Sequence, residues 1–281
     1  MHMNIGHHRL SNGYGNHSLG NVHRLMNKRH LEKKDVVVED LSEKLIPILG
    51  QVKFAAVIHN LFTPQECANF IEAAEKKGFI NALVHGPDGT EILRKDLRNS
   101  GRCIIDDEDL AQAWFDRMTQ ALEGSPVKNR IFDAYWLEDH EDQGAHRSLR
   151  AVGLNERLRF LRYHRGQHFG FHRDNEYTRG SEFGPREGEE SRLTFLLYLN
   201  DKMEGGQTRI ESGGRYVDIV PETGSVLIFD QDIIHAAMPV SSGKKYCCRT
   251  DIMFAINNPS AKPAIKLCPR EDLWTSHVGS A

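Results

Sequence analysis

Apolar residues recur at helical spacing in two segments of the first half of the chain. The first helix is predicted to begin at residues 63–66, because Thr63 and Glu66 have the spacing of a capping box and Pro64 suits the first helical position. Gly78 can end this helix. A second amphipathic helix is predicted from about Asp107, with its apolar side formed by Leu110, Trp114, Met118 and Leu122, and with Gly124 at its end.

From about residue 158 the pattern changes to short segments rich in Val, Ile, Phe, Tyr and Leu, separated by Gly, Pro, Asn and Asp. The strands predicted on this basis are 158–163, 193–199, 216–220, 225–229 and 246–254. Regular strands of this length, broken by turn residues, favour a β-sandwich or barrel over βαβ units. The pattern therefore predicts an α+β fold, with helices first and a jelly-roll-like pair of sheets after them.

These patterns divide the chain into four parts. Residues 1–35 lack apolar periodicity and are predicted to be a disordered tail. Residues 36–150 form an N-terminal helical or mixed part, 151–258 the sheet core, and 259–281 a C-terminal extension. The loop 175–190 is long, Gly-rich and charged, and a loop of this length in a compact domain is typical of a functional segment such as a substrate lid.

Composition narrows the class of protein. The formal net charge of -3 argues against a general nucleic-acid or membrane-surface binder, and no apolar stretch is long enough to span a bilayer. Five scattered cysteines without a CxxC pair fit reduced thiols, and no secretory h-region is present, so we expect an intracellular, cytoplasmic protein. Residues 1–31 contain no Asp or Glu and carry four Arg or Lys residues, which leaves organellar targeting as a weaker alternative.

The chemistry is concentrated around His172-Arg-Asp174. On a strand, residues two apart face the same side, so His172 and Asp174 can present an imidazole and a carboxylate to one metal ion. His235, which follows the predicted strand 225–229, is the candidate third ligand. Two His and one carboxylate on one face of an octahedron are the ligand set of non-haem Fe(II) oxygenases. His140 begins a second His-x-Asp pattern, but its acidic surroundings predict a solvated loop.

The residues around these ligands resemble the prolyl 4-hydroxylase-like branch of the Fe(II)/2-oxoglutarate-dependent dioxygenases, over roughly residues 54–254. The resemblance rests on three motifs that follow one another along the chain. The first is Tyr163-x-x-Gly166-x-x-Phe169-x-x-His172-x-Asp174, and the second is 193–200 followed by Glu204-Gly-Gly-x-Thr208. The third consists of Pro221-x-x-Gly224 with 227–229, then His235, then Pro239-Val240-x-x-Gly243-x-Lys245-Tyr246. Gly205 and Gly206 are predicted to be turn residues with positive φ.

The resemblance implies a double-stranded β-helix that binds Fe(II) through His172, Asp174 and His235 and uses 2-oxoglutarate and O2 as cosubstrates; ascorbate is a further candidate cofactor. It also implies a basic residue for the distal carboxylate of 2-oxoglutarate. Lys245 has the expected spacing from His235, and Arg249 lies on the same face of the predicted strand, so both are candidates. Tyr163 and Thr194 match positions that donate hydrogen bonds to that carboxylate.

The implied activity is hydroxylation of a C–H bond in a protein side chain, prolyl or other, or in a small molecule, with release of succinate and CO2. One departure concerns the substrate: Asp251 stands where prolyl hydroxylases usually have Trp late in the last strand, which weakens the case for peptidyl proline. Two alternatives are a catalytically silent β-helix module that binds a partner through 175–190, and a cupin-type metal protein that does not use 2-oxoglutarate. The sequence does not define the substrate or the oligomeric state.

Overall fold

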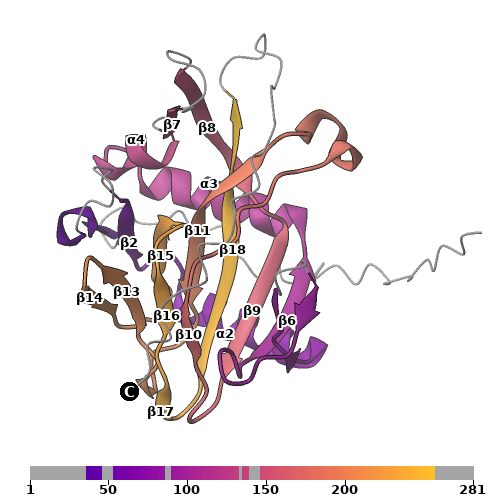
Figure 1. The fold of residues 1–281 in the computed structure, drawn as a ribbon, viewed down its shortest axis with the longest axis vertical. Helices are drawn as coiled ribbons and strands as arrows, with labels where there is room; N and C mark the ends of the chain where they lie inside the picture. The colour runs from indigo at the N-terminus through magenta and orange to yellow at the C-terminus, as the bar shows by residue number, and fades with distance from the viewer. Residues whose placement is uncertain (1–35, 46–52, 86–89, 133–134, 139–145, 257–281) are drawn as a thin grey trace, which may run out of the picture.

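The computed structural model describes residues 36–45, 53–85, 90–132, 135–138 and 146–256 (Figure 1). The predicted tail 1–35, the C-terminal extension 259–281 and the second His-x-Asp pattern at His140 lie outside these ranges. Within them, no helix is long and apolar enough to cross a membrane.

A large antiparallel sheet of ten strands forms the centre of the described part of the chain (Figure 1). Its main path runs in the order β1 (Val37–Asp40), β2 (Ala55–His59), β15 (Val226–Asp230), β11 (Glu190–Tyr198), β18 (Lys245–Ile256), β9 (Arg157–Tyr163), β6 (Gly101–Asp106) and β3 (Ile80–Asn81). β8 (His146–Leu154) also pairs with β18, and β7 (Tyr135–Glu138) pairs with β8. The N-terminal part therefore supplies strands as well as helices.

A smaller sheet has the order β10 (Phe169–His172), β16 (His235–Ala237), β13 (Thr208–Ser212) and β14 (Arg215–Ile219). Along the chain, β9, β11, β15 and β18 belong to the large sheet, while β10, β13, β14 and β16 belong to the small one. This alternation between two facing antiparallel sheets is that of a jelly roll. It confirms the predicted α+β class and the double-stranded β-helix core. Two short strand pairs complete the fold: β4 (Val84–His85) with β5 (Glu91–Ile92), and β12 (Glu204–Gly205) with β17 (Val240–Ser242).

Helices cover the outer face of the large sheet (Figure 1). They are α2 (Pro64–Lys77), α3 (Glu108–Ala121) and the short α4 (Val127–Phe132), with 3-10 turns η1 (Ser42–Lys44) and η2 (Ser181–Arg186) elsewhere. The predicted capping box is present at α2, where Glu66 N donates to Thr63 Oγ1 and Thr63 N donates to Glu66 Oε2. The side chain of Asp107 caps α3 through the Leu110 amide. Both predicted helices are thereby confirmed.

The large sheet separates two apolar cores because its side chains alternate between faces. One core lies against the helices, where Trp114 stands 5.1 Å from Phe70 and 6.0 Å from Phe195, ring centroid to ring centroid. The other lies between the two sheets and contains Tyr163 among other residues. Cys247 and Cys248 take opposite sides of β18 and belong to different cores, as free, buried thiols. The second core leads directly to the predicted metal ligands.

The loop 175–190 is folded rather than extended. The side chain of Arg179 is fully buried and forms ion pairs with Glu156, at 2.6 Å, and Glu189, at 2.9 Å. Arg186 adds weaker pairs to the same two carboxylates. Buried arginine forks of this kind hold a segment in one geometry. The loop is thus fastened to the turn between β8 and β9, and its predicted role as a substrate lid stays a prediction.

Candidate metal centre

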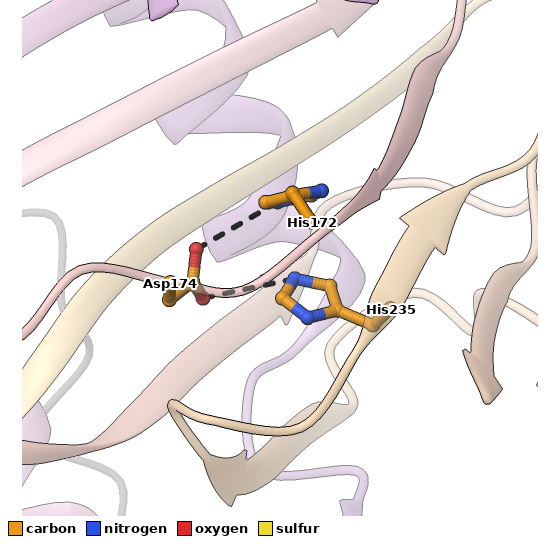
Figure 2. Close-up of side chains that lie close together, drawn as sticks. All are labelled: His172, Asp174 and His235. Carbon is orange, nitrogen blue, oxygen red and sulfur yellow. Dashed lines mark ion pairs between the residues drawn. The ribbon is translucent and has the colours of Figure 1, made fainter. Parts of the chain in front are cut away.

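The three predicted ligands come from two neighbouring strands of the small sheet and the segment after one of them (Figure 2). His172 ends β10 and His235 begins β16, and the two residues are direct partners in the antiparallel register. Asp174 follows β10, where its amide donates to the Gln231 carbonyl at 2.9 Å. Antiparallel pairing therefore brings together residues that are more than sixty positions apart in the sequence.

The ligand atoms converge on one point. His172 Nε2 lies 3.7 Å from Asp174 Oδ1, and His235 Nε2 lies 3.7 Å from Asp174 Oδ2. One ligand atom from each residue falls within 4.8 Å of the others, which is a spacing that a single metal ion can bridge (Figure 2). Two imidazoles and one carboxylate suit Fe(II) among the transition metals.

Both imidazoles are oriented with Nε2 toward this point. Nδ1 of His172 lies 2.8 Å from the Gly170 carbonyl, and Nδ1 of His235 lies 2.9 Å from the Ile233 carbonyl. A carbonyl only accepts, so each Nδ1 carries the proton and leaves the Nε2 lone pair free for a metal. Phe169 stacks on the His172 ring with centroids 3.5 Å apart, which fixes its plane.

Electrostatics keep the three groups in the protonation states that metal binding needs. Burial, followed by the nearby His235, lowers the pKa of His172 to about 3, and burial likewise lowers the pKa of His235. Burial on its own would raise the pKa of Asp174, but Arg249 and the two imidazoles outweigh it and hold that pKa well below its usual range. Neutral imidazoles and an ionised carboxylate are therefore present near neutral pH.

The second oxygen of Asp174 is occupied by protein donors. Thr194 Oγ1 donates to Asp174 Oδ2 at 2.5 Å, and Arg249 Nε donates to the same oxygen at 3.0 Å. Thr194 and Arg249 had been candidates for the distal carboxylate of 2-oxoglutarate. In the structure both are instead directed at the candidate metal ligand.

Lys245 lies in different surroundings. Its side chain is buried between the rings of Tyr163 and Tyr198, with Nζ 5.6 and 5.5 Å from the two centroids. Nζ donates to the Gly206 carbonyl at 2.5 Å, and within the described ranges no carboxylate pairs with it. Burial lowers its pKa. Gly205 and Gly206 both have positive φ, as predicted, and this turn places the Gly206 carbonyl against the ammonium group.

Tyr163 is the direct register partner of Lys245 across β9 and β18. The structure thus sorts the four predicted cosubstrate residues into two pairs: Lys245 with Tyr163, and Arg249 with Thr194. It also adds one cation that the sequence patterns had not indicated. Arg98 lies over the Phe169 ring at 4.5 Å and interacts electrostatically with Tyr163 and Asp174. The segment around Arg98 lacks strand or helix periodicity, so only the tertiary structure shows that Arg98 interacts with Tyr163 and Asp174.

Comparisons with known proteins agree with this geometry. Residues 158–250 match the family model of the 2OG-Fe(II) oxygenase superfamily. About a third of the chain is therefore similar to this superfamily. The match runs from β9 to the middle of β18, and so includes all seven predicted site residues. It confirms the predicted resemblance to the Fe(II)/2-oxoglutarate-dependent dioxygenases, whose cofactors are Fe(II), 2-oxoglutarate and O2.

Several relatives of this chain carry prolyl 4-hydroxylase names. "Probable prolyl 4-hydroxylase 8" of Arabidopsis thaliana is 23% identical, with 73% of this chain and 70% of the relative covered. The bovine "Prolyl 4-hydroxylase subunit alpha-3" is 28% identical over 49% of this chain and 29% of its own length. A prolyl hydroxylase structure from Trichoplax adhaerens, solved with a peptide of the hypoxia inducible factor oxygen degradation domain, has 15% identity and a TM-score of 0.48, and covers 70% of this chain and 82% of that chain.

Proposed function

We propose that the protein is a dioxygenase that hydroxylates a C–H bond of a protein side chain or small molecule, using Fe(II) held by His172, Asp174 and His235. The observation that carries this proposal is the convergence of two free Nε2 atoms and one carboxylate in a buried site. When bound, iron and 2-oxoglutarate supply the oxidising power, with succinate and CO2 as coproducts. The protein orients the metal ligands, binds the cosubstrate and excludes water from the site.

Lys245 is the group we assign to the distal carboxylate of 2-oxoglutarate. It is a desolvated ammonium without a carboxylate partner in the described part of the chain, at the end of the inter-sheet core. A buried charge is costly until it is paired, so an incoming carboxylate is stabilised strongly there. We assign Tyr163, whose ring lies beside Nζ, as a second hydrogen-bond donor to the same carboxylate. Ascorbate stays a candidate additive for the assay.

Peptidyl proline is the first substrate to test, because the relatives carry prolyl 4-hydroxylase names. Asp251 supports testing other side chains and small molecules as well, because a buried acid takes the place of the Trp usual in prolyl hydroxylases. Succinate formation without added substrate gives a readout that does not depend on this choice.

The test is succinate formation from 2-oxoglutarate with Fe(II) and O2, alone and with proline-containing peptides. We expect slow formation by the wild-type oxygenase, acceleration by a true substrate, and none by His235→Ala. The matched control is His59→Ala, because His59 lies in an exposed pair with Glu222 away from the site. Succinate formation that persists in His235→Ala would contradict the proposal. Metal binding without any 2-oxoglutarate turnover would favour the cupin-type alternative.

A further inference from the structure

Asp251 is a buried carboxylate on the same face of β18 as Lys245 and Arg249. It is 1% exposed, and its two oxygens are surrounded by four side chains. These are Arg249 Nη2 at 2.9 Å, Gln231 Nε2 at 3.1 Å, Arg159 Nη1 at 3.2 Å and Asn155 Nδ2 at 3.4 Å. Three of these groups donate hydrogen bonds and the fourth forms an ion pair, so the carboxylate is enclosed by protein and leaves no room for a ligand. Asp251 can therefore affect the reaction only through the side chains that it contacts.

The two arginines around Asp251 would repel each other without it. Arg159 and Arg249 are direct register partners on β9 and β18, and like charges in that position destabilise a strand pair. Asp251 contacts both guanidinium groups, and Arg249 reaches onward to Asp174. The result is a line of alternating charge: Arg159, Asp251, Arg249, Asp174.

Arg249 is held in one orientation by this line. Its Nε donates to Asp174 Oδ2 at 3.0 Å, while Nη2 forms an ion pair with Asp251 at 2.9 Å that lacks hydrogen-bond geometry. The planar guanidinium can face both carboxylates at once, which a lysine ammonium could not do in the same geometry. Asp251 therefore determines where Arg249 stands relative to Asp174.

Gln231 connects the same network to the backbone of Asp174. Its side-chain amide donates to Asp251, its Oε1 accepts from Ser191 Oγ, and its carbonyl accepts from the Asp174 amide. Gln231 is 2% exposed, so these contacts are shielded from water. The orientation of Asp174 is thus fixed both at its side chain and at its backbone.

The geometry points to Asp251 and Arg159 as positioning residues that hold Arg249 against Asp174 and so restrict Asp174 to one metal-coordinating oxygen. With Oδ2 taken by Thr194 and Arg249, only Oδ1 is free for an ion. A single carboxylate oxygen leaves three positions open on an octahedral metal, whereas a bidentate carboxylate would take one of them. This inference rests on the proposed function, because it assumes a metal at His172, Asp174 and His235.

Asp251→Asn tests the inference in the full-length protein, with Co(II) alone as the probe. Partners of metal ligands change metal affinity by about 10- to 100-fold when they are lost. We expect Co(II) to bind Asp251→Asn at least tenfold more weakly, with an altered visible absorption spectrum of the bound ion. Asp218→Asn is the matched control, because Asp218 pairs with Arg209 on the exposed face of the small sheet at 2.7 Å. It should bind Co(II) as the wild type does.

A second titration separates positioning from cosubstrate binding. At saturating Co(II), Asp251→Asn should bind 2-oxoglutarate with nearly wild-type affinity, because Lys245 is untouched. Arg249→Lys should keep part of the Co(II) affinity that Arg249→Leu loses, since an ammonium can still contact Asp174. If Asp251→Asn does not fold, the double variant Asp251→Asn, Arg159→Gln removes one charge of each sign and takes its place in both titrations.

The outcomes distinguish this inference from the proposed function. Wild-type Co(II) affinity and spectrum in the Asp251 variant, or a loss of 2-oxoglutarate affinity in place of Co(II) affinity, would overturn the inference while the proposed function stands. Failure of the wild-type protein to bind Co(II) at all would overturn both. Weakened Co(II) binding with a changed spectrum and intact 2-oxoglutarate binding supports it.

Discussion

Lys245 and Arg249 lie four residues apart on the same face of β18, yet their surroundings differ completely. Lys245 is buried among tyrosine rings, and its ammonium contacts a backbone carbonyl but no carboxylate in the described ranges. Arg249 contacts the carboxylates of Asp174 and Asp251. Among the residues that the structure describes, the first cation has no carboxylate counter-ion and the second has two.

This difference supports Lys245, rather than Arg249, as the cation that binds an anionic ligand. An unpaired buried charge carries a desolvation penalty that an anionic ligand relieves, whereas a charge already paired gains little from another anion. Residue type favours Arg249, whose fork suits a carboxylate, whereas the spacing from His235 favours Lys245, so the sequence left both residues as candidates. The partners of each side chain support the proposed assignment of Lys245 to the cosubstrate.

The largest expected effect comes from Lys245→Met. Removing one partner of a buried ion pair costs about 2–5 kcal/mol, so the affinity for 2-oxoglutarate should fall by roughly 30-fold or more. Isothermal titration of the Co(II)-loaded protein measures this. Arg249→Lys is the comparison variant, and its affinity for 2-oxoglutarate should stay within a few-fold of wild type. A larger loss in Arg249→Lys than in Lys245→Met would reverse the assignment of the two cations.

Burial also lowers the pKa of the candidate ligand His172, and this makes the stability of the metal-free protein depend on pH. Its pKa is lowered to about 3 in the folded chain, whereas an unfolded histidine has a pKa of about 6.5. Below pH 6.5 only the unfolded chain takes up this proton, so stability is lost as pH falls toward 3. Between pH 7 and pH 5 the metal-free protein should lose about 2 kcal/mol through this group.

Urea unfolding of the metal-free protein at pH 7 and pH 5 measures that loss, and His172→Phe should reduce it. An unchanged pH dependence in this variant would show that His172 is solvated, and would weaken the description of a dry ligand site.

Thr194→Val tests whether Thr194 acts on the candidate metal ligand Asp174, as Arg249 does, or on the cosubstrate, as proposed for Lys245 and Tyr163. The variant keeps the shape of the side chain but removes the donor to Asp174 Oδ2. A hydrogen bond to a charged group contributes about 1.5–3 kcal/mol, so Co(II) affinity should fall by roughly tenfold or more. Calorimetric titration should find 2-oxoglutarate affinity at saturating Co(II) unchanged. A selective loss of 2-oxoglutarate affinity would return Thr194 to the cosubstrate role that the sequence motif implies.

The smallest effect is expected from Thr63→Ala, far from both cations. It removes the side-chain cap of α2 and should lower the free energy of unfolding by about 1 kcal/mol. Denaturant unfolding checks this, and binding of Co(II) and 2-oxoglutarate should not change. Weaker binding in this variant would mean that general stability, rather than local contacts, governs the other results.

Local rules were sufficient for several elements of this protein. The helices α2 and α3 follow from their capping residues and apolar spacing. The pairing of His172 with Asp174 was predicted from strand alternation, and the two side chains do converge although Asp174 lies just after β10. These features depend on residues close together in the sequence, where backbone geometry limits the possibilities.

Other features depend on contacts between distant segments. Strand alternation places Lys245, Arg249 and Asp251 on one face. It could not show that Asp251 forms an ion pair with Arg249, while Lys245 has no carboxylate partner in the described ranges. That division requires Arg159 from β9 and Gln231 from the segment after β15. The N-terminal strands β1, β2 and β6 were likewise hidden, because their membership of the large sheet is decided by pairing with β15 and β9.

The most direct test of the central claim is an anaerobic titration of the Fe(II)-loaded protein with 2-oxoglutarate, followed in the visible spectrum. Chelation of iron by the cosubstrate should produce a weak metal-to-ligand charge-transfer band in the wild type, and His172→Ala should abolish it. Absence of the band in folded, iron-loaded wild-type protein would contradict the account and favour a cupin-type metal protein. Failure of the folded wild type to bind iron would contradict it more deeply and favour a silent binding module.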